Sequence, residues 1–134
     1  MALVADNSVV LAWFVKGQAT PYTWGVLERA ASGEAVHVPA LWHQEFVNAL
    51  IVLERRQRLK AGDAAQAFRE VGNLNLVVDQ KLVALEALAD LARRYKLSAY
   101  DATYLELATR LRLPLACRDG PLKAALPKAG VALV

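Results

Sequence analysis

Four acidic residues of this 134-residue chain stand at points where a carboxylate side chain can do chemistry. Asp6 and Asp119 each follow a short apolar run typical of a buried strand, and Asp101 lies near the start of an expected helix. Glu45 lies nearly two turns into the helix that follows another apolar run. Clustered carboxylate oxygens bind Mg²⁺ or Mn²⁺ far better than they bind soft metals. If the four side chains meet, they predict a metal-dependent phosphodiesterase.

Each of these acids also has a purely structural interpretation. Asp6 and Asp119 could cap the helices that follow them, which contributes about 1 kcal/mol. Ser98 and Asp101 match the capping-box pattern, in which the acid accepts a bond from the N–H of the capping residue. Glu45 could face solvent. The joint pattern favours a common site, because four carboxylates brought together repel one another and a divalent cation relieves that repulsion.

Strand-like and helix-like segments alternate along the chain, and this alternation decides where the acids can lie. In a parallel sheet, ligands sit in the crevice beyond the carboxyl ends of the strands. The pattern predicts a three-layer α/β/α sandwich with a small, mostly parallel sheet, in a single domain over residues 1–134. The expected strands are 3–5, 36–38, 76–78, 115–117 and 131–133, and the expected helices are 7–15, 21–32, 39–58, 63–71, 81–95, 98–111 and 121–125.

Composition narrows the class of protein further. Although 56% of the residues are hydrophobic and the mean hydropathy is +0.25, no apolar run approaches the roughly 18 uncharged residues of a membrane-spanning helix. We see no secretory signal at the N-terminus, and the lone Cys117 excludes an internal disulfide, so we expect a cytoplasmic protein. The net charge of +3 and pI near 9.2 favour nucleic acid as a partner.

Four short stretches, each containing one of the four acids, are spread over nearly the whole chain. They are VADNS at 4–8, EFVNAL at 45–50, LSAYDATYL at 97–105 and LACRD at 115–119. In their order and spacing they resemble the PIN-domain ribonucleases of the VapC toxin type. One departure is Arg118, because family members often place a small polar residue just before the last aspartate.

This resemblance implies a function and a set of site residues. Asp6, Glu45, Asp101 and Asp119 would form an acidic site for Mg²⁺ or Mn²⁺, with Ser8 holding the first aspartate. The activity would be endoribonuclease cleavage by metal-activated water, which leaves a 5′-phosphate and a 3′-hydroxyl. The family pattern also implies a toxin that is held in check by a cognate antitoxin protein, and a homodimer.

Several cations could contact an RNA backbone. Arg118 and Lys123 flank the proposed site, so we expect them to bind substrate. The basic residues at 55–60 and 110–112 end predicted helices, where the helix dipole alone attracts positive side chains. Asp79 could either reach the crevice or cap the next helix.

Two other functions fit parts of the pattern. A non-catalytic interaction module could keep this fold without chemistry, and some aromatic residues of the first third could then line a partner groove. A receiver-like phosphoacceptor domain also places acids at strand ends. It needs an acidic pair after the first strand and a lysine after a late one, whereas Asp6 is followed by Asn7 and Ser8, and Arg118 is not a lysine.

Overall fold

A four-stranded parallel sheet forms the centre of the molecule in the computed structural model, which describes residues 1–134. Its strands are β1 (Ala2–Ala5), β2 (Ala35–Pro39), β3 (Leu76–Asp79) and β4 (Leu115–Ala116), in the order β3-β2-β1-β4. All three pairings are parallel. Parallel neighbours need long crossovers, which place helices on both faces of the sheet.

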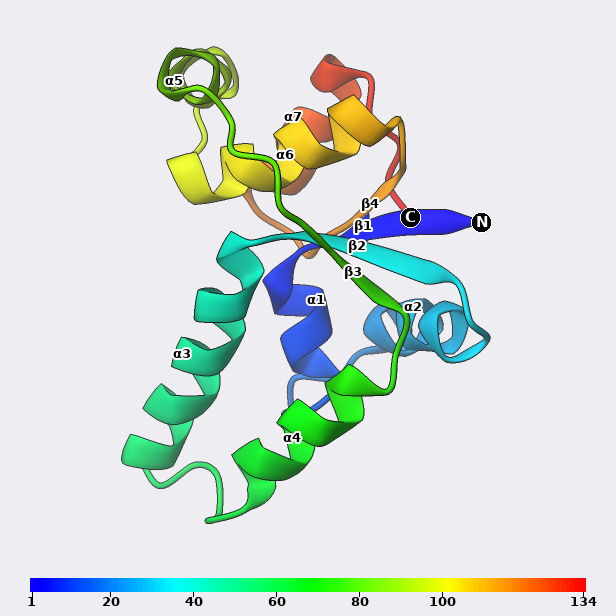
Figure 1. Cartoon of the computed structure of the whole chain (residues 1–134), viewed down its shortest axis with the longest axis vertical. Coiled ribbons are helices and arrows are strands. Elements are labelled where there is room, and N and C mark those ends of the chain that lie inside the picture. The colour runs from blue at the N-terminus through cyan, green and yellow to red at the C-terminus, as the bar shows by residue number, and fades with distance from the viewer.

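Two layers of helices enclose this sheet (Figure 1). The helices α1, α2, α3 and α4 cover one face, and α5, α6 and α7 cover the other. Their bounds are α1 Asn7–Ala12, α2 Pro21–Ala31, α3 Leu41–Arg55, α4 Asp63–Gly72, α5 Leu85–Tyr95, α6 Ala99–Leu111 and α7 Pro121–Ala129. The predicted three-layer α/β/α fold with a parallel sheet is therefore confirmed.

The core explains why these elements form where they do. Leu3, Val4 and Ala5 of β1 are fully buried, as expected for a central strand covered on both faces. On one side α3 contributes Phe46, and on the other α6 contributes Tyr104, both nearly inaccessible to solvent. None of the helices combines the length and the apolar character that crossing a bilayer requires.

Several boundaries differ from the sequence prediction. The helix α1 ends at Ala12 rather than near residue 15, and α3 covers Leu41–Arg55 rather than 39–58. The helix α5 begins at Leu85 rather than at residue 81, and Leu82 is 94% exposed on the segment before it. The helix α7 continues through Pro127 to Ala129 and ends at Gly130, whose φ of +71° suits glycine. The expected strand at 131–133 is reduced to one bridge between Leu115 and Leu133, because β4 itself is only two residues long.

A cluster of charged side chains ties the edge strand to the helix layer. Both Nη atoms of Arg110 donate to the Asp79 carboxylate, at 3.2 and 2.6 Å. Arg110 Nε also donates to Glu106 Oε1 at 2.7 Å. The Arg110 guanidinium lowers the pKa of Asp79. Neither interpretation of Asp79 from sequence was right, because its carboxylate joins β3 to α6.

We predict that Arg110→Met lowers the free energy of unfolding by about 1–2 kcal/mol, because Asp79 loses a bidentate charged partner in a partly buried position. The depressed pKa of Asp79 means that this contribution is present at neutral pH and fades below pH 3.8, as the carboxylate takes up a proton. Urea unfolding of both proteins at several pH values measures it.

The control is Arg93→Met, because the Arg93 guanidinium lies 3.8 Å from Asp90 and both side chains are highly exposed. Surface pairs of this kind contribute about 0–1 kcal/mol. Equal losses in the two variants would contradict a special role for the Arg110 cluster.

Candidate active site

Asp6 lies directly after β1, at the carboxyl edge of the sheet where α1, α3 and α6 all begin (Figure 1). Its backbone N–H donates to the Ala116 carbonyl at 2.9 Å, which fixes it beside β4. The Asp6 side chain makes no capping bond to α1. Instead, Ser8 Oγ donates to Asp6 Oδ2 at 2.6 Å. Ser8 therefore holds the carboxylate from within the first turn of α1.

Glu45 comes to the same edge from α3, which starts beside β2. Its Oε1 accepts a hydrogen bond from the Tyr104 hydroxyl of α6 at 2.6 Å. Burial raises the pKa of Glu45, the bond from Tyr104 opposes that rise, and the charges of Asp6 and Asp101 add to it. The solvent-facing interpretation of Glu45 is therefore wrong, because its carboxylate is half-buried and points into the site.

Asp101 is left free for the site by the way α6 begins. Ser98 is the N-cap of α6, and its Oγ accepts a bond from the Asp101 backbone N–H at 3.0 Å. The reciprocal bond of a capping box is present in α2, where Thr23 bonds back to Thr20, but is absent in α6. Burial and the charge of Asp6 raise the pKa of Asp101. The capping-box interpretation therefore covers Ser98 but not the Asp101 carboxylate.

These three carboxylates form an electrostatic unit. Burial raises the pKa of Asp6 despite the bond from Ser8, and the charge of Asp6 in turn raises the pKa values of Glu45 and Asp101. No three acidic, histidine or cysteine side chains stand close enough to form a complete metal-binding group as they lie. The donor set itself fits a hard divalent cation, because it consists of carboxylate oxygens that repel one another at short range.

Asp119 behaves differently from the other three acids. Its side chain is 94% exposed, and Asp119 Oδ1 accepts a bond from Lys123 Nζ at 2.8 Å. Lys123 lowers the pKa of Asp119, opposite to the shift of the buried acids. The N-cap of α7 is Gly120, so Asp119 does not cap that helix. The structure thus places Asp119 outside the trio, paired with a lysine.

The two predicted substrate cations already have partners within the chain. Lys123 is the partner of Asp119. Arg118 Nη1 donates to the Gln18 carbonyl at 3.1 Å and so ties the segment after β4 to the loop after α1. To bind a substrate, each side chain must first break its bond to Asp119 or to Gln18.

Sequence reasoning assigned no role to Tyr104, which the structure places inside the site. Tyr104 is 1% exposed, and burial together with its bond to Glu45 raises its pKa well above the ordinary value, so the hydroxyl stays a donor. The usable signal was its spacing, because residues three apart share one face of a helix and Tyr104 follows Asp101 by three.

Cys117 and Asn7 complete the surroundings of Asp6. Burial and the charge of Asp6 raise the pKa of Cys117 to about 12, so this thiol is inert, as expected from sequence. Asn7 Oδ1 is buried and has no hydrogen-bond partner within the chain.

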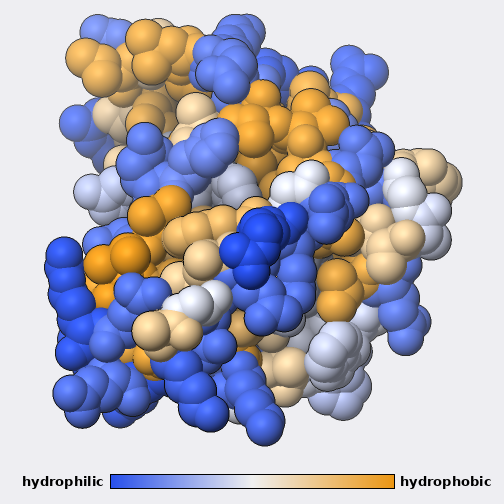
Figure 2. Space-filling view, turned by 60° about the horizontal axis from the view of Figure 1, so that its bottom comes forward, coloured by the Kyte–Doolittle hydropathy of each residue, from blue (hydrophilic) through white to orange (hydrophobic).

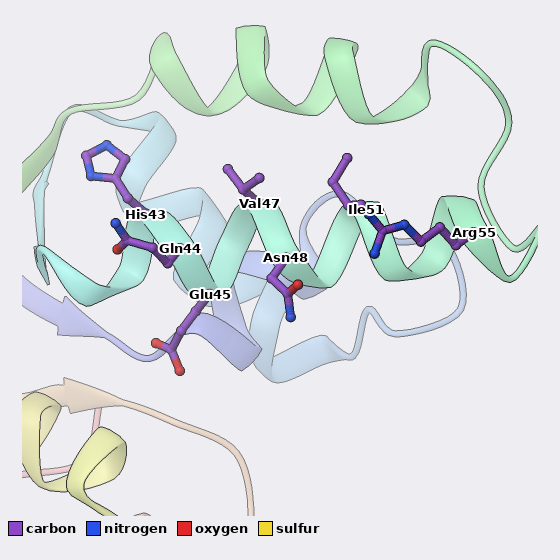
Figure 3. Close-up of a pocket in the computed structure, with 7 residues that line it drawn as sticks. All are labelled: His43, Gln44, Glu45, Val47, Asn48, Ile51 and Arg55. Atoms are coloured by element: carbon purple, nitrogen blue, oxygen red, sulfur yellow. The ribbon is translucent and has the colours of Figure 1, made fainter.

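An open groove of about 710 Å³ follows the exposed side of α3, and Glu45 lies in its wall (Figure 3). It is lined by His43, Gln44, Glu45, Val47, Asn48, Ile51 and Arg55. Figure 3 shows Glu45 and Asn48 pointing to the same side of the helix. The candidate site is therefore continuous with a surface that can hold a larger ligand.

Comparison with known proteins agrees with this arrangement. The family model for the PIN domain matches residues 3–125. VapC ribonuclease Mb0985 of Mycobacterium bovis is 31% identical over 118 residues, which cover 87% of this chain and 85% of that protein. Ribonuclease VapC9 of Mycobacterium tuberculosis matches with the same identity and coverage.

Two solved structures share the fold. PAE2754 from Pyrobaculum aerophilum has a TM-score of 0.72 at 21% identity, covering 99% of this chain and 83% of its own. FitAcB from Neisseria gonorrhoeae has a TM-score of 0.65 at 17% identity, covering 98% of this chain and 95% of its own. With the sequence match over most of its length, the chain belongs to the PIN-domain family and is a relative of the VapC ribonucleases.

Proposed function

We propose that this protein is an Mg²⁺- or Mn²⁺-dependent endoribonuclease and the toxin of a toxin–antitoxin pair. The observation that carries the proposal is the trio of Asp6, Glu45 and Asp101 at the carboxyl edge of the sheet, where burial raises the pKa of each acid and the charge of Asp6 further raises those of Glu45 and Asp101. Catalytic groups are commonly found where burial and like charges shift pKa values together. The relationship to VapC ribonucleases supplies the substrate class.

We assign the metal ion to the trio, with Asp119 as a fourth acid that must leave Lys123 to take part. A bound divalent cation supplies activation of a water molecule and neutralisation of the phosphoryl oxygens during attack. Ser8 and Tyr104 orient Asp6 and Glu45 through their hydroxyls. Cys117 takes no part, because its thiol stays protonated at neutral pH.

The competing functions fit the structure less well. A receiver-like fold has the strand order 2-1-3-4-5, whereas this sheet has the order β3-β2-β1-β4. A non-catalytic module would have no reason to hold three repelling carboxylates together in a partly buried place, where each raises the cost of the others.

We further propose that the antitoxin fills an apolar cavity of about 310 Å³ between α3, α4 and β3. Trp42, Phe46 and Phe68 are the aromatic residues of its wall, and Trp42 Nε1 is buried there without a partner. Trp13 lies in the core, where its Nε1 donates to the Thr23 carbonyl. Trp42 and Phe46 belong to the buried core, as Trp13 does, but they also line this cavity, whereas Trp13 does not.

We propose that two copies of the chain form a homodimer through α5, because no residue of this helix is buried. Leu82, Leu85 and Tyr100 expose 94%, 81% and 62% of their surface around this helix. Apolar patches also interrupt the charged surface in Figure 2. Large exposed apolar patches mark interaction sites, and Leu82 and Leu85, three residues apart in the chain, both expose most of their surface.

The decisive experiment incubates the purified protein with total cellular RNA in Mg²⁺, Mn²⁺ or EDTA and maps new 5′ ends. We expect metal-dependent cuts at a few sites. Asp101→Asn should lower the cleavage rate by about 100-fold or more, because it removes a charge that holds the cation. Its melting temperature should rise at neutral pH, because a carboxylate with a raised pKa destabilises the folded state when ionised.

The matched control for this experiment is Asp90→Asn, which removes an exposed acid on α5. It should cut as the wild type does. Cleavage that persists in EDTA, or in Asp101→Asn, would sink the metal-site assignment. An absence of cuts with either metal would favour the interaction module.

Tyr104→Phe tests the role of the hydroxyl that holds Glu45. We expect Mn²⁺ affinity, measured by calorimetry, to fall by about 10–100-fold, because the loss of a residue that orients a metal-binding carboxylate typically lowers metal affinity by this factor. Cleavage should then need more Mn²⁺ for half-maximal rate. Tyr95→Phe on α5 is the control, and unchanged Mn²⁺ affinity in Tyr104→Phe would reduce Tyr104 to a packing residue.

Leu85→Glu tests the α5 face. We expect a dimer of the wild type to become a monomer in light scattering after size exclusion, because charge on an apolar interface carries a desolvation cost. Trp24→Glu, at a 51% exposed position of α2, should leave the dimer intact. A monomeric wild type, or a dimeric Leu85→Glu, rules out this interface.

A further inference from the structure

The groove along α3 has a regular internal order. Gln44, Asn48, Ile51 and Arg55 follow one another at steps of four, three and four residues, which places them in one stripe on a helix. Glu45 borders the stripe on one side and Val47 on the other. The stripe therefore starts next to the proposed metal site and ends at the last residue of α3.

The charge along this stripe suits an anionic strand. Glu45 is the only acid that lines the groove, and it lies at the catalytic end. Arg55 takes part in none of the ion pairs of the chain, whereas Lys123 is engaged with Asp119. Exposed basic residues continue beyond the groove at Arg56, Arg58 and Lys60. Arg55 is thus a cation available for a ligand.

The length and donor types define the ligand further. Ten residues from Glu45 to Arg55 span about 15 Å of helix, which matches about four phosphates at the spacing of a stacked strand. Gln44 and Asn48 carry both hydrogen-bond donors and acceptors, which can read the Watson–Crick edges of unpaired bases. In a duplex these edges are occupied by the complementary strand.

We propose that the Gln44–Asn48–Ile51–Arg55 stripe is the substrate track, which holds a single-stranded RNA segment leading from the site at Glu45. This inference rests on the proposed ribonuclease function. Arg55 binds a phosphate of the strand, and Gln44 and Asn48 contact the bases next to the scissile bond. The stripe, rather than Arg118 and Lys123, then selects the sequence that is cut.

The test is fluorescence anisotropy of a short, labelled single-stranded RNA with the full-length protein in EDTA, where no metal-dependent cleavage occurs. Arg55→Gln should weaken binding about fivefold and reduce the slope of log affinity against log salt by about 0.7, the value of one phosphate contact. Asn48→Ala should weaken binding severalfold without changing that slope. Arg69→Gln is the control, because Arg69 lies in the last turn of α4 and does not line the groove.

The outcomes separate this track from the proposed function. The track is overturned if Arg55→Gln binds RNA like the wild type, or if Arg69→Gln loses as much affinity as Arg55→Gln does. Either result counts against the track even if the protein cleaves RNA. Equal affinity for a duplex of the same sequence overturns its single-strand character. Arg55-dependent binding by a protein that cuts no RNA with Mg²⁺ or Mn²⁺ supports the track and contradicts the nuclease.

Discussion

The mutual repulsion of Asp6, Glu45 and Asp101 is the constraint on which the rest of this structure depends. Each of these ionised carboxylates would be more stable in water, because burial raises the pKa of all three and like charges add to the rise for Glu45 and Asp101. The fold holds them near one another through the starts of three separate helices around β1, whose residues Leu3, Val4 and Ala5 are fully buried. Packing of the core therefore stabilises an arrangement that electrostatics opposes, which is typical of a site made for a charged ligand.

Hydroxyl groups, rather than cations, hold the trio in place. Ser8 bonds to Asp6 and Tyr104 bonds to Glu45, so two of the acids are oriented without being neutralised. An arginine in either position would form an ion pair and lower the pKa, as Arg110 does for Asp79. The contrast shows two uses of an acid in one chain, because Asp79 joins two elements and the trio keeps its negative charge available.

Much of the fold was predictable from sequence, because apolar runs and helix signals here reflect real burial. The strand before Asp6 and the cap at Ser98 are examples, since both depend on neighbours in sequence. The start of α5 and the end of α7 were not predictable, because the periodic leucines begin before the helix does and Pro127 lies inside one.

The gathering of Asp6, Glu45 and Asp101 was predictable from sequence, but the pairing of Asp119 with Lys123 and the orientation of each acid were not. Asp101 follows the N-cap residue Ser98 by three positions, which fits both a capping box and a metal site. Only the structure shows that the Asp101 carboxylate makes no hydrogen bond to the Ser98 backbone N–H. The pairing of Glu45 with Tyr104 joins residues 59 apart in the chain. No local sequence pattern predicts a hydrogen bond between residues so far apart, so such long-range partners could not be predicted from the sequence.

The cations near the site also depend on contacts that the sequence does not reveal. A basic residue close to a site acid in sequence is not necessarily free to bind a ligand. Arg118 and Lys123 flank Asp119, yet each already has a partner within the chain. Arg55 lies ten residues from the nearest acid of the trio, has no ion-pair partner, and shares a groove with Glu45. A phosphate that approaches Arg55 displaces no internal bond, whereas at Lys123 it must compete with Asp119. The free cation is therefore the better substrate contact, and α3 links it directly to the acidic site.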